Sequence, residues 1–95
     1  MTLEKTLVLE TGRSVKVITQ HANLVDQENI ELDILIKEPK EEHFRPPIGV
    51  THPKYWKLKN MDPKKSRLLQ LRYSGLSAKQ VRKVVRELRT EISVD

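Results

Sequence analysis

The 95-residue chain is 37% apolar and 33% charged, contains no cysteine, and carries 18 Lys and Arg against 13 Asp and Glu. Its length excludes two folded domains, and the lack of cysteine excludes disulfides, thiolate metal sites and thiol nucleophiles. No apolar run approaches the roughly 18 residues that span a bilayer, and residues 1–5 lack a secretory pattern, so we expect a soluble cytoplasmic protein with no membrane partner.

Three β-branched runs predict strands over residues 3–9, 14–19 and 30–37. Gly12 lies between the first two runs and can adopt the positive φ of a tight connection, which predicts a β-hairpin. The third run alternates apolar and acidic residues, as expected of a strand buried on one face. Its inward residues are Ile30, Leu32, Ile34 and Ile36, and its outward residues are Glu31 and Asp33.

Three consecutive strands most simply form an antiparallel β-meander, which we expect over residues 1–37. A polar connection joins the second strand to the third, and it contains one apolar pair, Leu24 and Val25. We expect this pair to pack against the sheet.

Residues 38–61 contain four of the five prolines and no apolar period, which predicts an extended connector. Three of the four aromatic residues also lie in this connector. Burial of an aromatic ring is among the largest single contributions to a small core. We therefore expect Trp56 to pin the connector to the sheet and Tyr55 to point outward.

Helix signals are clearest over residues 62–92. Asp62 followed by Pro63 predicts a helix N-terminus, and Gly75 predicts the end of that helix after residue 74. Ser77 and Gln80 have the spacing of a capping box, which predicts a second helix from residue 78 to residue 89 and on to about residue 92.

The second predicted helix is amphipathic. Its apolar face consists of Val81, Val84, Val85, Leu88 and Ile92, and its cationic face consists of Lys79, Arg82, Lys83, Arg86 and Arg89. Neither the sheet nor the helices alone bury enough apolar surface to be stable, so the two parts should pack together. The sequence therefore predicts one α+β domain over residues 1–95. It comprises a three-stranded antiparallel β-meander, a proline-rich connector, and a C-terminal two-helix helix-turn-helix pair packed on one sheet face.

No constellation in the sequence is typical of an active site or a metal centre. The histidines, His21, His43 and His52, match no metal-ligand spacing. The serines lie in no nucleophile-elbow context, and the three glycines are too dispersed for a phosphate loop. We therefore expect no catalytic residue, no metal and no cofactor, and a protein that is not an enzyme.

Residues 67–84 resemble the DNA-binding helix-turn-helix motif. The positions that match its turn glycine and packing residues are Gly75, Leu76, Val81 and Val84. The resemblance implies that the second helix enters the major groove, with residues near its start at base edges and flanking cations at phosphates. The implied base-edge residues are Lys79, Gln80, Arg82 and Lys83, and the implied backbone contacts are Arg86 and Arg89. The sequence departs from the motif at Gln70, where an apolar residue is usual, and at Leu71, where a small one is usual.

A second basic segment, residues 51–60, places two adjacent aromatic residues among three lysines. Exposed rings beside cations suit single-stranded nucleic acid, because bases stack on rings and phosphates attract ammonium groups. Because the core position expected for Trp56 competes with this role, the secondary nucleic-acid surface is assigned to Lys54, Tyr55 and Lys57.

The charge is unevenly distributed, with a net charge of −3 on residues 1–50 and +8 on residues 51–95. Such asymmetry favours a polyanionic partner, although a basic helix face can also be a solvated surface. We expect a small non-catalytic binding module whose partner is DNA or RNA. The alternative is a protein-protein interaction or adaptor domain with an acidic protein partner. The acidic strand face of Glu31 and Asp33 is opposite in charge to the helical surface, so self-association is also conceivable, and an exposed strand edge could accept a partner strand. The oligomeric state and the biological role stay open at this point.

Overall fold

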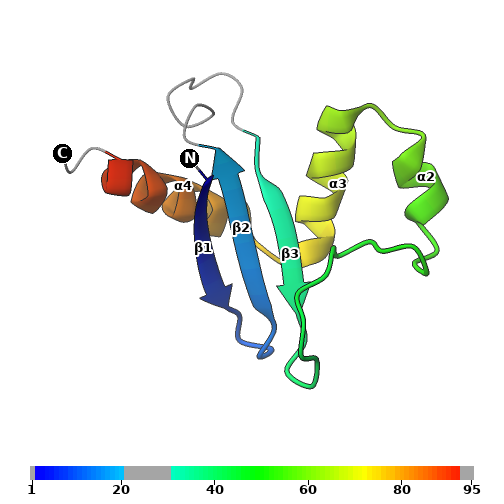
Figure 1. Cartoon of the computed structure of the whole chain (residues 1–95), viewed down its shortest axis with the longest axis horizontal. Coiled ribbons are helices and arrows are strands. Elements are labelled where there is room, and N and C mark those ends of the chain that lie inside the picture. Colours follow the sequence, from blue (N-terminus) through cyan, green and yellow to red (C-terminus); the bar gives the residue numbers. More distant parts are fainter. Residues whose placement is uncertain (1, 21–30, 93–95) are drawn as a thin grey trace.

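The computed structural model describes residues 2–20 and 31–92, which form a three-stranded antiparallel sheet and helices (Figure 1). The strands are β1 (Thr2–Val8), β2 (Ser14–Gln20) and β3 (Asp33–Lys37), and the helices are α2 (Tyr55–Lys59), α3 (Pro63–Ser74) and α4 (Ala78–Ile92). The predicted α+β class is confirmed. The predicted positions of Leu24, Val25 and Ile30 lie outside the described residues.

The sheet has the strand order β1-β2-β3 expected of a meander. Leu7 pairs with Val15, and Val15 pairs with Ile36, which aligns the apolar residues of the three strands on one face. Gly12 closes the predicted hairpin with φ +89°, and its N–H donates to the Leu9 carbonyl at 2.9 Å. The local hairpin signal was therefore sufficient to predict this connection.

The connector is tied to the rest of the molecule by its backbone. Arg45 and Ile36 of β3 exchange two backbone hydrogen bonds in an isolated β-bridge, with N···O distances of 2.7 and 2.8 Å. Gln70 of α3 holds the buried Ile48, because its Oε1 accepts from the Ile48 N–H at 2.8 Å and its Nε2 donates to the Ile48 carbonyl at 3.1 Å. Ile48 is thus the anchor of the connector, and residues 55–59 form the short helix α2 where an extended segment was predicted.

Trp56 is not the anchor of the connector, and the prediction that it enters the core is wrong. Tyr55 and Leu58 lie on the same side of α2, about 60° apart at roughly 100° per residue, and both are half-buried. That orientation turns Trp56 toward solvent, where 67% of it is exposed. The expected outward position of Tyr55 is wrong for the same reason.

The ends of α3 and the start of α4 match the sequence signals. The Asp62 carboxylate accepts hydrogen bonds from the backbone N–H groups of Lys64 and Lys65 at 3.0 and 3.1 Å. Gly75 ends α3 in the left-handed region with φ +93°. Ser77 and Gln80 exchange the two bonds of a capping box, at 3.1 and 2.8 Å.

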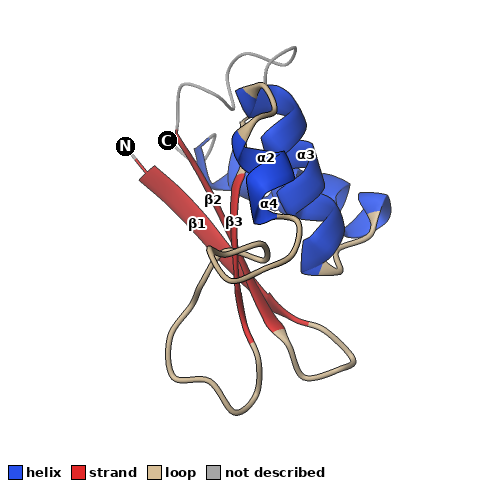
Figure 2. Ribbon diagram, turned by 90° about the vertical axis from the view of Figure 1, so that its right-hand side faces the viewer, coloured by secondary structure: helices blue, strands red, loops and turns tan. Residues whose placement is uncertain are grey.

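The core lies between the sheet and the helices, which Figure 2 shows on one side of the sheet. It consists of Val15, Val17, Ile34, Ile36, Leu76, Val84, Val85 and Leu88. Helix α3 lies against β3 and helix α4 against β1, so the two helices diverge from the turn that joins them (Figure 1). The predicted inward position of the Ile92 side chain lies outside the described part of the structure.

Candidate nucleic-acid interface

The outer face of α4 is oriented by the burial of its inner face. Val84 and Leu88 are fully buried, and Val85 is nearly so. A helix advances about 100° per residue, so burial of these three side chains directs the opposite face to solvent. Four predicted binding residues are exposed on that face, and we call them the α4 strip: Lys79, Arg82, Lys83 and Arg86.

The carboxylates in the described ion pairs are paired with cations outside the α4 strip. Within residues 2–20 and 31–92, none of its four cations forms an ion pair. Carboxylates of the first fifty residues are paired with other cations, in the pairs Glu31–Arg67, Glu38–Arg13 and Glu41–Arg45. Glu87 of α4 itself faces Lys5 of β1, with 3.2 Å between the carboxylate oxygen and Nζ. The strip is therefore a run of solvent-exposed positive charge on a helix that the core holds in place.

Two other predicted residues of α4 have partners within the protein. The Gln80 amide accepts the backbone N–H of Ser77, so Gln80 would have to release this cap before its oxygen could contact a base edge. Arg89 is half-buried at the border of the inner face, and its side chain or backbone already interacts with another group of the protein. The predicted set on α4 thus divides into four solvent-exposed cations and two side chains with structural partners.

The second predicted surface lies in residues 54–65, which we call the α2 lobe. Lys54 and Lys57 are exposed there, whereas Tyr55 is half-buried and presents only part of its ring. The lobe also contains three exposed lysines that were not assigned to a site from the sequence, namely Lys59, Lys64 and Lys65. Their density along the chain was the signal that could have revealed them, because Asp62 is the sole acidic residue of the segment.

The structure does not join the two predicted surfaces into one patch. In Figure 1 the α2 lobe forms one end of the long axis, α4 extends toward the other end, and α3 lies between them. The molecule is 43 Å long in this direction. A ligand that contacts both surfaces must therefore span much of the molecule.

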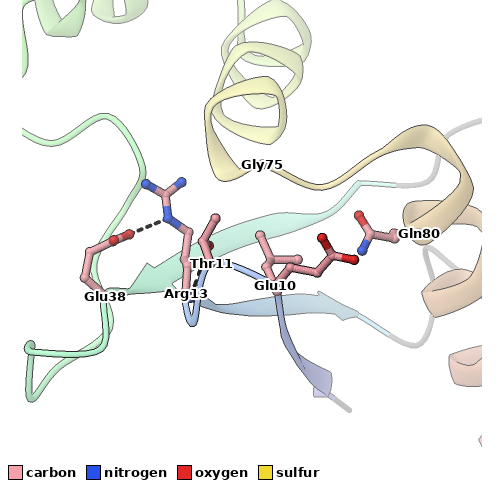
Figure 3. A pocket seen from close by; sticks show the side chains of 7 residues that line it. Glu10, Thr11, Arg13, Glu38, Gly75 and Gln80 are labelled. Atoms are coloured by element: carbon pink, nitrogen blue, oxygen red, sulfur yellow. Dashed lines mark hydrogen bonds and ion pairs between the residues drawn. The ribbon is translucent and has the colours of Figure 1, made fainter.

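A hollow of about 460 Å³ lies where the β1–β2 turn, the connector and the α3–α4 turn meet (Figure 3). Arg13 forms an ion pair with Glu38 on one side of the hollow. Its Nη1 also donates to the Tyr73 and Ser74 carbonyls at the end of α3, both at 3.1 Å. Gln80 lines the other side and belongs to the cap of α4. These polar side chains hold the hairpin, the connector and α3 together, so we assign the hollow a structural role.

The histidines do not form a metal centre in the described residues, where no group of three or more His, Cys, Asp or Glu side chains could hold a metal ion. His52 accepts the backbone N–H of Lys54 at 3.0 Å, and its ring is nearly perpendicular to that of Tyr73, with 5.4 Å between the ring centroids. His43 is exposed, and His21 lies outside the described residues. Within residues 2–20 and 31–92, no helix combines the length and apolarity needed to cross a membrane.

Comparisons with known proteins were made against family models, curated proteins and solved structures, and none of the three found a match. The functional interpretation therefore rests on the geometry and charge of the two surfaces.

Proposed function

We propose that the protein is a small non-catalytic cytoplasmic module that binds nucleic acid through the α4 strip. The observation that carries this proposal is the exposure of four cations without an ion pair in the described residues, on a helix whose opposite face is buried. Phosphates that approach such a strip release condensed counterions, which supplies most of the affinity of a non-specific DNA or RNA contact.

The helix-turn-helix resemblance refines this proposal for duplex DNA. Three features support it: the left-handed Gly75, the buried Leu76 after it and the capping box at the start of α4. Lys79, Arg82 and Lys83 would then lie nearest the bases, with Arg86 at the backbone. The two departures from the motif have structural roles here, because Gln70 binds the connector backbone and Leu71 packs against the core.

A second candidate function, binding of an acidic protein partner, is favoured by one observation. An open hollow of about 360 Å³ lies between α3 and α4, and Arg72 and Arg82 are among the residues that line it. Its apolar lining consists of Leu68, Leu71, Leu76, Ala78 and Val81. An apolar segment that carries Asp or Glu would match both the lining and the arginines.

Affinity measured against salt concentration tests the proposed function. Fluorescence anisotropy with labelled duplex DNA, single-stranded DNA and RNA gives the affinity of the full chain and of Lys83→Glu, Arg86→Glu and the double variant. We expect each single reversal to weaken binding about tenfold at low salt. The salt slope for duplex DNA should fall by about 0.9 for each phosphate that the variant no longer neutralises.

The matched control is Lys40→Glu, which makes the same charge reversal at an exposed position of the connector. It should retain most of the affinity. If Lys40→Glu and Lys83→Glu lose affinity equally, the loss reflects the net charge of the protein and the proposed site is overturned. Tight binding that ignores salt would overturn the proposed partner, and selective binding of an acidic apolar peptide would favour the second candidate function.

A further inference from the structure

Trp56 is the sole tryptophan of the chain and is 67% exposed. A domain of this size gains much from burying such a ring, so an outward tryptophan is not explained by folding. No residue of α2 is buried, and the helix is carried at one end of the molecule beside α3 (Figure 1). The ring is therefore accessible to a partner on a protruding part of the fold.

The surroundings of Trp56 are cationic. Lys59 Nζ lies 5.3 Å from the centroid of the Trp56 ring, within the range of a cation–π contact. The Tyr55 ring meets Trp56 edge-on, with 5.7 Å between centroids and 71° between planes. The α2 lobe adds four more exposed lysines, Lys54, Lys57, Lys64 and Lys65.

The one acidic side chain of the lobe caps a helix and is not paired with a lysine side chain. The Asp62 carboxylate caps α3 by accepting the backbone N–H groups of Lys64 and Lys65. None of the five lysines forms an ion pair within the described residues. The lobe thus combines an exposed aromatic ring with five lysine charges not paired with carboxylates.

This combination discriminates between classes of partner. A purely apolar partner would desolvate the lysines without compensation, which costs free energy. A duplex could meet the lysines with its phosphates, but its base faces are already stacked on one another. An unpaired nucleotide presents a free base face to the ring and a phosphate to the ammonium groups, as in single-strand binding sites.

We infer that the α2 lobe binds an unpaired segment of nucleic acid, with a base stacked on Trp56 and flanking phosphates at the surrounding lysines. The inference rests on the proposed function for the general class of partner. It adds that the ligand contains unpaired nucleotides, and that they are held at a surface separate from the α4 strip.

Trp56 itself reports on the interaction, because all tryptophan fluorescence of the chain comes from this residue. The full chain is titrated with single-stranded oligo(dT) and oligo(rU), a duplex of equal length, inorganic polyphosphate, and vesicles of phosphatidylserine and phosphatidylcholine. We expect saturable quenching by the single strands that weakens with salt, and much less quenching by the duplex and by polyphosphate at equal occupancy. Equal quenching by polyphosphate would overturn the inference. A blue shift with vesicles and no change with single strands would also overturn it, in favour of a lipid surface.

Substitution provides the second measurement, by anisotropy of labelled oligo(dT). Trp56→Ala should weaken binding about fivefold to a hundredfold, which is the range for stacking one base, and Trp56→Phe should recover part of the loss. Val8→Ala removes another exposed large apolar side chain, 72% exposed at the end of β1, and should leave the affinity unchanged. An unchanged affinity in Trp56→Ala would overturn the inference.

The α4 variants separate this inference from the proposed function. Loss of duplex binding in Lys83→Glu, with no response of Trp56 to single strands in the unmodified chain, would support the proposed function and overturn the inference. The opposite result is also informative. If the unmodified chain does not bind duplex DNA, and single strands still quench Trp56 in Lys83→Glu, the α4 proposal is overturned and the inference is supported.

Discussion

The α4 strip and the α2 lobe both present cations to solvent, but only the strip is backed by a core. Val84 and Leu88 are fully buried beneath it, whereas no residue of α2 is buried. The Leu58 carbonyl of the lobe instead accepts a hydrogen bond from Ser66 Oγ of α3 at 3.0 Å. Because buried apolar area dominates folding free energy, binding residues of the lobe can be changed at little cost to stability, while the inner residues of α4 cannot.

The largest expected effect tests this difference directly. Leu88→Ala should lower the free energy of unfolding by about 2–5 kcal/mol, because it leaves a cavity in the core beneath the α4 strip. Trp56→Ala in the lobe should change it by less than about 0.5 kcal/mol. Urea unfolding followed by circular dichroism at 222 nm measures both values. A loss in Trp56→Ala comparable to that in Leu88→Ala would show that the lobe is part of the cooperative core.

The next largest loss of stability is expected from a substitution at the junction between α3 and α4. Gly75 has φ +93°, and a Cβ there would lie 3.1 Å from Leu9 Cδ1, so Gly75→Ala should cost about 1–2 kcal/mol. Gly49 provides the matched control, because a Cβ at this position meets nothing within 4 Å and its φ is not positive. Gly49→Ala should leave the thermal midpoint unchanged or slightly raised. Equal destabilisation by the two substitutions would contradict the assigned role of Gly75.

Arg13 links the sheet to the end of α3 and should contribute about 1 kcal/mol. Its guanidinium pairs with Glu38 and donates to the last carbonyls of α3, where a positive charge also favours the helix dipole. Arg13→Ala should lose this contribution. Arg13→Lys should lose most of this contribution, because an ammonium group cannot reproduce the planar set of N–H donors of a guanidinium group. Full stability of Arg13→Lys in urea unfolding would show that charge alone is sufficient at this junction.

These comparisons explain which features were predictable from the sequence. The hairpin at Gly12, the cap at Asp62 and the capping box at Ser77 were found because each depends on residues within a few positions of one another. The outward cations of α4 were found because its apolar residues repeat with the helical period. Local chemistry and periodicity were therefore sufficient for the sheet, for α3 and for the α4 strip.

Side-chain placement in the connector was not predictable in this way. No apolar period runs through residues 38–61, so composition alone suggested that the largest ring would be buried. The actual anchor depends on Gln70, which lies 22 positions away in the sequence and binds both backbone groups of Ile48. The pairing of Glu31 with Arg67 and of Glu38 with Arg13, rather than with cations of the α4 strip, is equally non-local.

The connector begins with a charge cluster that should produce a small pH effect. Glu41 accepts from Arg45 Nε at 2.7 Å and from the Glu38 backbone N–H at 2.8 Å, while Lys37 Nζ donates to its carbonyl. The hydrogen bond from Arg45, and then that from Glu38, hold the pKa of the Glu41 carboxyl below its usual value of 4.5. Because Arg45 also bridges Ile36, this carboxylate helps to hold the chain that leads to the α2 lobe against β3.

The smallest expected effect follows from the sign of that shift. A lowered pKa in the folded state means that the ionised carboxylate stabilises the fold above its ordinary pKa, and that this contribution is lost as the pH falls through the folded-state value. Glu41→Gln should therefore be slightly less stable than the unmodified chain at neutral pH, and the difference should shrink below about pH 4. Glu42→Gln removes the same charge at an exposed neighbouring position and controls for net charge. The urea midpoints of each variant and of the unmodified chain are measured at neutral pH and below about pH 4. If the difference in midpoint between Glu41→Gln and the unmodified chain is the same at both, the Glu41 carboxylate does not hold the connector in place.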